Sequence, residues 1–131
     1  MARSVLDVLI VEDEPVLAKN ICAYLLRYGY QVRITTTAEA GLSQLETFRP
    51  DIIVLDFKLP GMNGLEALLR IRALDREIKV LMMSADCGAD LPLKALRAGA
   101  SDFIMKPMSV GNLRLKLEEI AGDALCDQVA P

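Results

Sequence analysis

The chain has 131 residues, of which 53% are hydrophobic and 25% are charged, and its formal net charge is −3. This length and composition indicate one compact domain, and the mild negative charge argues against a nucleic-acid surface in this chain. No apolar run approaches the ~20 residues of a membrane span, and the amino terminus does not resemble a secretory signal. The absence of histidine excludes imidazole as a base, nucleophile or zinc ligand, and three widely spaced cysteines indicate free thiols in a reducing cytoplasm.

Strands and helices are expected to alternate along the chain. Short aliphatic runs predict buried strands, and apolar residues spaced near 3.6 predict amphipathic helices. In chain order we expect a strand at 5–11, a helix from Pro15 to about Tyr28, a strand at 31–35, a helix at 38–48, a strand at 52–56, a helix at 65–74, a strand at 79–84, a helix ending at Ala98, a strand at 101–105 and a helix from the cap Ser109 to about Ala121. This alternation predicts an α/β fold whose parallel sheet is covered on both faces.

Polar side chains stand where the predicted strands end. Four aliphatic residues run directly into Asp56, and the ends of three other strands carry Glu12 with Asp13, Ser84 and Lys106. The carboxyl ends of parallel strands lie on one edge of a sheet, where ligands bind in open α/β folds. Each of these residues alone has an ordinary explanation as a cap or turn residue, but together they supply three acids, a hydroxyl and an ammonium to one place.

That combination is suited to phosphoryl transfer. Clustered carboxylates repel one another, and a hard divalent cation such as Mg²⁺, which prefers oxygen ligands, relieves the repulsion. An ammonium and a hydroxyl can bind phosphoryl oxygens, and aspartate is a competent nucleophile that forms an acyl phosphate. The first strand-to-helix turn carries acids in place of glycines, which excludes a P-loop and a dinucleotide fingerprint.

Four sequence segments resemble the receiver domains of two-component response regulators. They are VLIVEDE at 8–14, DIIVLDFKLPGMNG at 51–64, VLMMSA at 80–85 and AGASDFIMKP at 98–107, and the resemblance covers about residues 6–121. It implies a doubly wound, flavodoxin-like (βα)5 sheet with strand order 2-1-3-4-5. It also implies a receiver domain over residues 1–121, followed at 122–131 by a tail or by the start of a linker to an output domain.

The resemblance implies a role for individual residues of the site. Asp56 would be the phospho-acceptor, and Glu12, Asp13, Asp56 and the backbone carbonyl of Lys58 would be Mg²⁺ ligands. Ser84 and Lys106 would bind the phosphoryl group. Ser84 with Phe103 would form the moving switch pair, and the bond between Lys106 and Pro107 would be cis. The commonest family pattern has aspartate at the positions of Glu12 and Asn63 and threonine at that of Ser84. The substitutions at Glu12 and Ser84 keep the chemistry, and that at Asn63 is expected to be neutral.

The resemblance also implies partners. A sensor histidine kinase or a phosphotransfer protein would supply the phosphoryl group, and the domain would catalyse its own phosphorylation and dephosphorylation without being a classical turnover enzyme. Leu115 falls off the apolar stripe of the last helix. Together with the sheet edge that carries Phe103, Leu115 marks the face of the fourth helix, fifth strand and fifth helix. We expect this face to be the output or dimer surface.

Other interpretations stay open at this point. A degenerate receiver would dock partners without phosphorylation, although the complete set of acceptor-site residues argues against it. A phosphatase of the dehalogenase kind needs a second aspartate where this chain has Lys58. Lys58 and Asp86 each lie two residues beyond a site residue and carry opposite charges. We expect them to pair and to hinder the water that hydrolyses the acyl phosphate, although two solvated side chains explain the pattern equally well.

Overall fold

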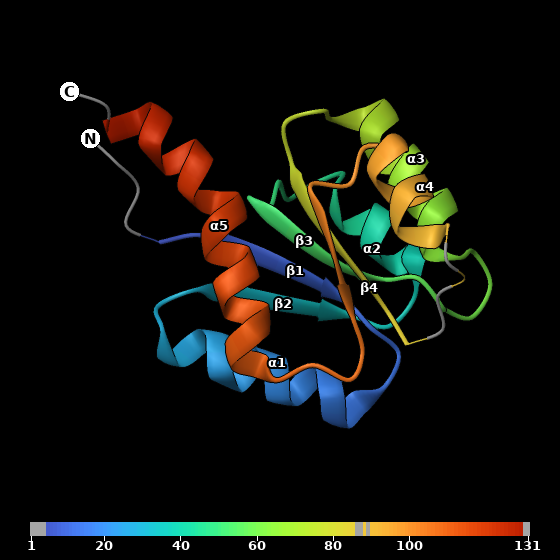
Figure 1. The fold of residues 1–131 in the computed structure, drawn as a ribbon, viewed down its shortest axis with the longest axis horizontal. Helices are drawn as coiled ribbons and strands as arrows, with labels where there is room; N and C mark the ends of the chain where they lie inside the picture. The colour runs from blue at the N-terminus through green and yellow to red at the C-terminus, as the bar shows by residue number, and fades with distance from the viewer. Residues whose placement is uncertain (1–4, 86–87, 89, 130–131) are drawn as a thin grey trace.

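A computed structural model shows an α/β fold with a five-stranded parallel sheet in the order β2-β1-β3-β4-β5, which confirms the predicted fold class and strand order (Figure 1). The structure describes residues 5–85, 88 and 90–129. In chain order the elements are β1 (Asp7–Val11), α1 (Pro15–Arg27), β2 (Gln31–Thr35), α2 (Ala38–Gln44), β3 (Ile52–Asp56), α3 (Gly64–Leu74), β4 (Lys79–Ser84), α4 (Leu91–Arg97), β5 (Asp102–Met105) and α5 (Val110–Val129).

The core consists of two apolar layers, one on each face of the sheet. Alternate residues of a strand point to opposite faces, so Leu9 and Val11 lie in the layer under α2, α3 and α4, whereas Val8 and Ile10 lie in the layer under α1 and α5. The three central strands are buried on both faces, which explains their nearly continuous aliphatic sequences. No helix within the described residues is long and apolar enough to cross a membrane.

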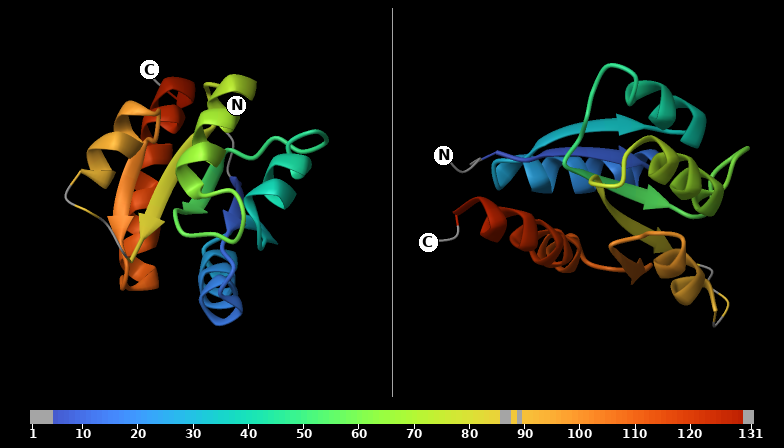
Figure 2. Two further views of the ribbon diagram at one scale, coloured as in Figure 1. Left: turned by 90° about the vertical axis from the view of Figure 1, so that its right-hand side faces the viewer. Right: turned by 90° about the horizontal axis from the view of Figure 1, so that it is seen from above.

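The strand register aligns the carboxyl ends of the strands. Val11 pairs with Leu55, Asp56 pairs with Met83, and Ser84 pairs with Met105. The residues that follow these positions therefore emerge at the same edge of the sheet. Both ends of the described chain lie at the opposite side of the molecule (Figure 2).

Local signals explain most helix starts. The side chain of Thr37 accepts a hydrogen bond from the amide of Ala40 at the start of α2, and Asn63 accepts one from the amide of Glu66 at the start of α3. Asn63, expected to be a neutral replacement for the usual aspartate, is thus the N-cap of α3. Asparagine and aspartate are equally good N-caps, which is why the exchange preserves the turn.

Two helix ends differ from those predicted. The helix expected to reach Phe48 ends at Gln44, and residues 45–47 continue as turns whose amides bond three residues back. The last helix, expected to end near Ala121, runs to Val129. Gly122 is typical of a helix end, but the backbone stays helical through it.

Candidate functional site

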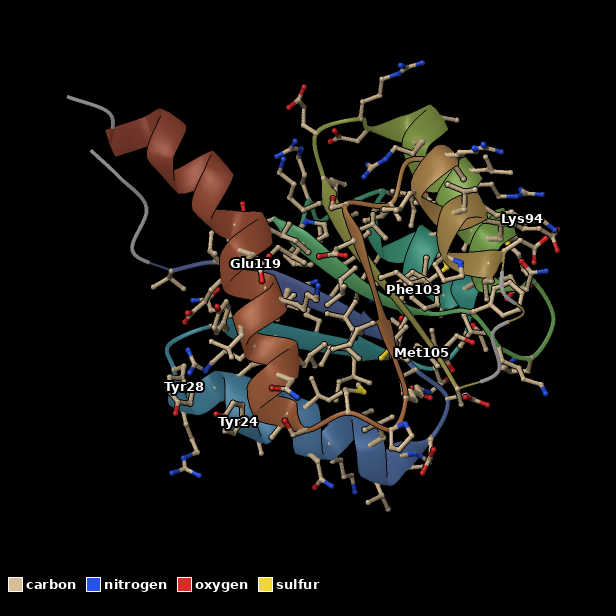
Figure 3. The ribbon with its side chains drawn as sticks, in the orientation of Figure 1. Tyr24, Tyr28, Lys94, Phe103, Met105 and Glu119 are labelled. Carbon is tan, nitrogen blue, oxygen red and sulfur yellow. The ribbon has the colours of Figure 1, made fainter. Side chains whose placement is uncertain are left out.

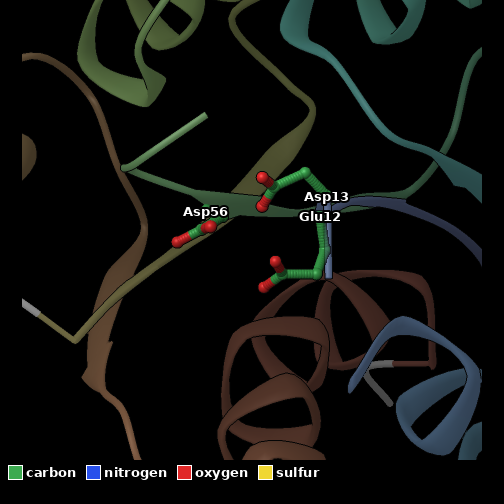
Figure 4. Close-up of side chains that lie close together, drawn as sticks. All are labelled: Glu12, Asp13 and Asp56. Atoms are coloured by element: carbon green, nitrogen blue, oxygen red, sulfur yellow. The ribbon is translucent and has the colours of Figure 1, made fainter. Parts of the chain in front are cut away.

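Three carboxylates converge at the carboxyl edge of the sheet. Glu12 and Asp13 follow β1, and Asp56 is the last residue of β3. One oxygen from each lies within 4.8 Å of the other two (Figure 4). Glu12 and Asp56 are only 1% and 3% exposed, whereas Asp13 is exposed to solvent. The rigid, doubly buried strands therefore hold two of the acids, and the third faces the outside.

The ammonium of Lys106 binds two of these carboxylates. Its Nζ lies 2.6 Å from Oε1 of Glu12 and 3.3 Å from Oδ1 of Asp56, and its side chain is 14% exposed. Lys106 follows β5, and the next peptide bond, to Pro107, is cis as the family resemblance implied. The structure thus brings together the acids and the lysine that the sequence placed at separate strand ends.

Burial controls the electrostatics of the site. It raises the pKa of Asp56, although the charge and hydrogen bond of Lys106 and the amide of Lys58 oppose it. Burial also raises the pKa of Glu12 against the hydrogen bond from Lys106. For Lys106, burial lowers the pKa, but the hydrogen bond to Glu12 and the charges of Asp56 and Glu12 outweigh it and raise the pKa overall. The lysine is therefore cationic, and the carboxylates still outnumber it.

The donor set fits magnesium. Mg²⁺ prefers oxygen ligands and is usually bound by one or two carboxylates with several waters. The three acids offer such oxygens around one point, at the side of a cleft that is also lined by Glu14, Lys58, Ala85 and Lys106. A divalent cation there would stabilise the ionised forms of the buried acids, whose raised pKa values show the cost of their burial.

Ser84 precedes Ala85, which lines the cleft, and Phe103 lies on the neighbouring strand β5. Ser84 ends β4 and is fully buried, and its carbonyl accepts a hydrogen bond from the amide of Lys106 at 2.9 Å. Phe103 is half-buried on β5 and packs against the layer under α2, α3 and α4. Met105 lies two residues further along the same strand and is exposed (Figure 3). Strand β5 therefore carries both a core-packed aromatic residue and an exposed residue.

One supporting contact was not predicted from the sequence. The amide of Glu14 donates a 3.0 Å hydrogen bond to Oε2 of Glu12, so both oxygens of this buried carboxylate are bound. The run of three acids was the signal that could have indicated it. Asp86 lies outside the described residues, so its expected pairing with Lys58 stays a prediction.

Comparisons with known proteins identify the family. The sequence model of the response regulator receiver domain matches residues 8–118. The chain is 32% identical over 113 residues to the probable transcriptional regulatory protein TcrX of Mycobacterium tuberculosis, covering 86% of this chain and 48% of TcrX. It is 30% identical over 119 residues to the transcriptional regulatory protein ZraR of Escherichia coli, covering 91% of this chain and 27% of ZraR.

Solved structures show the same fold. A response regulator receiver domain protein (CheY-like) from Methanospirillum hungatei matches with a TM-score of 0.88 and 31% identity, covering 92% of this chain and 96% of that one. The chain spans about half or less of the length of the two curated relatives. It belongs to the response regulator receiver domain family and is a receiver domain of two-component systems.

Proposed function

We propose that this receiver accepts a phosphoryl group on Asp56. The observation that carries the proposal is that Asp56 ends a doubly buried strand with its carboxylate 3.3 Å from the ammonium of Lys106. An Oδ atom of Asp56 attacks phosphorus, an O–P bond forms, and the bond from phosphorus to the donor nitrogen of a phosphohistidine breaks. The ammonium of Lys106 is close enough to bind an oxygen of the transferred group.

Glu12, Asp13 and Asp56, with the backbone carbonyl of Lys58, are proposed to hold Mg²⁺. When bound, the metal neutralises charge on the phosphoryl oxygens. Glu12 is fixed by its contacts with Lys106 and the amide of Glu14, and Asp13 faces solvent at the entrance. Lys58 lines the same cleft, and with Asp86 it is proposed to control the lifetime of the acyl phosphate.

Ser84 and Phe103 are proposed to transmit the modification. Phosphorylation of Asp56 adds up to one further negative charge and three acceptor oxygens. The hydroxyl of Ser84 is drawn toward these oxygens, and Phe103, half-buried on the neighbouring strand, moves inward. Such a two-state side chain changes the surface that it supports.

The partners are proposed to be a sensor histidine kinase or a phosphotransfer protein upstream, and an output segment or protein downstream. TcrX and ZraR are named as transcriptional regulatory proteins, and this chain covers less than half of each. The elements α4, β5 and α5 expose Leu93, Leu96, Met105 and Leu115, and we propose the face that these elements form as the output or homodimer surface. We place the phosphoryl transfer in the cytoplasm, a reducing compartment in which the three widely spaced cysteines would stay free thiols.

Incubation with acetyl phosphate, with and without Mg²⁺, tests the proposal. We expect intact-mass spectrometry to show one added phosphoryl group on the wild type only with Mg²⁺, and none on Asp56→Asn. Asp102→Asn is the matched control, because Asp102 is a half-buried aspartate that pairs with Lys116 away from the three acids. A wild type that is not modified with Mg²⁺ present would contradict the proposal and favour a degenerate receiver.

A further inference from the structure

The loop between β3 and α3 forms one wall of the acceptor site. Its inner end is fixed by backbone contacts: the amide of Phe57 donates to the carbonyl of Met83 at 2.9 Å, and the amide of Gly64 donates to the carbonyl of Phe57 at 2.7 Å. The amide of Lys58 binds the carboxylate of Asp56. The position of this loop therefore determines where the backbone of Lys58 stands relative to the acceptor.

A glutamate from another helix binds the outer end of the loop. Oε2 of Glu39, in the first turn of α2, accepts a 3.2 Å hydrogen bond from the amide of Met62. The same oxygen lies 3.0 Å from the point where a β-carbon on Gly61 would stand, so the loop backbone runs close against the carboxylate. Among the described residues, no other side chain outside the loop hydrogen-bonds residues 59–62.

Helix α2 is in turn fixed to the strand that carries the metal-binding acids. Ala38, next to Glu39, is buried in the same apolar layer as Val11, the last residue of β1. Glu12 follows Val11 directly, and its amide donates to the carbonyl of Thr35 at the end of β2. Glu39 therefore connects the frame that holds Glu12 and Asp13 to the loop that follows Asp56.

We propose that Glu39 is a positioning residue, which holds the β3–α3 loop so that the backbone of Lys58 faces the metal site. This inference rests on the proposed function, because it concerns the same Mg²⁺ site. The hydrogen bond needs only an acceptor oxygen at the end of this side chain, not a charge. A glutamate in the first turn of a helix also complements the helix dipole, but that effect acts on α2 and not on the loop.

The variants Glu39→Ala and Glu39→Gln separate these effects, because glutamine keeps an acceptor oxygen and removes the charge. Glu46→Ala is the matched control: Glu46 follows α2, is exposed, and has no side-chain hydrogen bond to a described residue. Two quantities are measured by NMR for each protein. They are the dissociation constant for Mg²⁺ and the hydrogen-exchange rate of the Met62 amide.

We expect Glu39→Ala to weaken Mg²⁺ binding about threefold to fivefold, the effect of one exposed hydrogen bond, and to accelerate exchange of the Met62 amide. Glu39→Gln should restore both values, and Glu46→Ala should change neither. Equal losses of Mg²⁺ affinity in both Glu39 variants would mean that the charge matters and would overturn the inference, as would Glu39→Ala behaving like Glu46→Ala.

The two proposals fail in different ways. A wild type that binds no Mg²⁺ contradicts the proposed function, and it also removes the site toward which Glu39 is argued to hold the loop. A wild type that binds Mg²⁺ and is phosphorylated, with a Met62 amide that exchanges equally fast in all four proteins, contradicts the role of Glu39 alone.

Discussion

The ammonium of Lys106 donates a 2.6 Å hydrogen bond to the carboxylate of Glu12, a residue 94 positions away in the sequence. Glu12 is almost completely buried, and Asp56 lies 3.3 Å from the same ammonium. Removing charged groups from water is costly, and here the lysine offsets part of that cost for two acids. With Mg²⁺ in the proposed site, the lysine and the metal would share this role.

Replacing Lys106 with methionine should therefore destabilise the protein in a metal-dependent way. Loss of one partner from a buried ion pair costs about 3 kcal/mol of the free energy of unfolding. Mg²⁺ should recover more of this free energy in the variant than it adds to the wild type, because the cation replaces the missing charge. Urea denaturation with and without Mg²⁺ measures both differences. Lys94→Met is the control, since Lys94 is exposed and, among the described residues, pairs only with Asp90. Equal Mg²⁺ effects in all three proteins would refute this explanation.

The start of α3 leaves no room for a side chain at Gly64. A β-carbon there would stand 2.4 Å from the carbonyl oxygen of Asp56 and 2.7 Å from the Cα of Phe57, which is closer than atoms pack. Gly64→Ala must displace the backbone next to the acceptor. We expect a loss of about 1–3 kcal/mol in the free energy of unfolding, together with weaker Mg²⁺ binding.

Gly122→Ala provides the control for this substitution. Gly122 lies in the interior of α5, and a β-carbon there would meet nothing within 4 Å. Alanine should raise the free energy of unfolding by up to about 1 kcal/mol, because it is the better helix former. If Gly64→Ala were as stable as Gly122→Ala, the close approach at Asp56 would have no energetic consequence.

The strands and the members of the site could be predicted from the sequence because their signals are local. The aliphatic runs of β3 and β4 fixed the bounds 52–56 and 79–84 that the structure shows. Parallel strands then place the residues that follow them on one edge, which was enough to group Glu12, Asp56 and Lys106.

The contacts within the site could not be predicted in the same way. That Lys106 binds Glu12 more closely than Asp56, or that Glu39 reaches the amide of Met62, depends on how β5 and α2 pack on the sheet. The predictions of two helix ends were wrong for a different reason. Gly122 is typical of a helix end, and a pattern of residue types does not show whether the backbone continues through it.

Phe103 should be needed for the response and not for the modification itself. Beryllofluoride with Mg²⁺, a stand-in for the phosphoryl group, is expected to bind Phe103→Ala as it binds the wild type. The NMR shift that it causes at the amide of Met105 should be lost, because Phe103 supports that end of β5. Phe48→Ala, which removes another half-buried aromatic from the same layer, is the control. A full shift at Met105 in Phe103→Ala would contradict the switch role.

Arg49 and Asp75 form an ion pair between the segment before β3 and the end of α3. Nε of Arg49 lies 2.5 Å from Oδ2 of Asp75, and the two side chains are 55% and 23% exposed. The hydrogen bond from Arg49 lowers the pKa of Asp75 from its ordinary value of 3.8, with help from the amide of Glu77. A carboxyl group whose pKa is lower in the folded state adds stability above its ordinary pKa, and that stability is lost as the pH falls through the folded value.

Asp75→Asn should therefore lower the free energy of unfolding at pH 7 by about 0.5–1 kcal/mol, a small effect because solvent weakens this partly exposed pair. Urea denaturation at pH 7, 5, 4 and 3 measures the gap between the variant and the wild type. The gap should be constant from pH 7 to 5 and should shrink below the ordinary pKa, because protonation removes the charge that asparagine already lacks. Glu46→Gln, at an exposed acid without an ion pair among the described residues, should show no such gap. A gap between Asp75→Asn and the wild type that persists unchanged down to pH 3 would contradict the prediction, because it would show that the charge of Asp75 contributes nothing to stability.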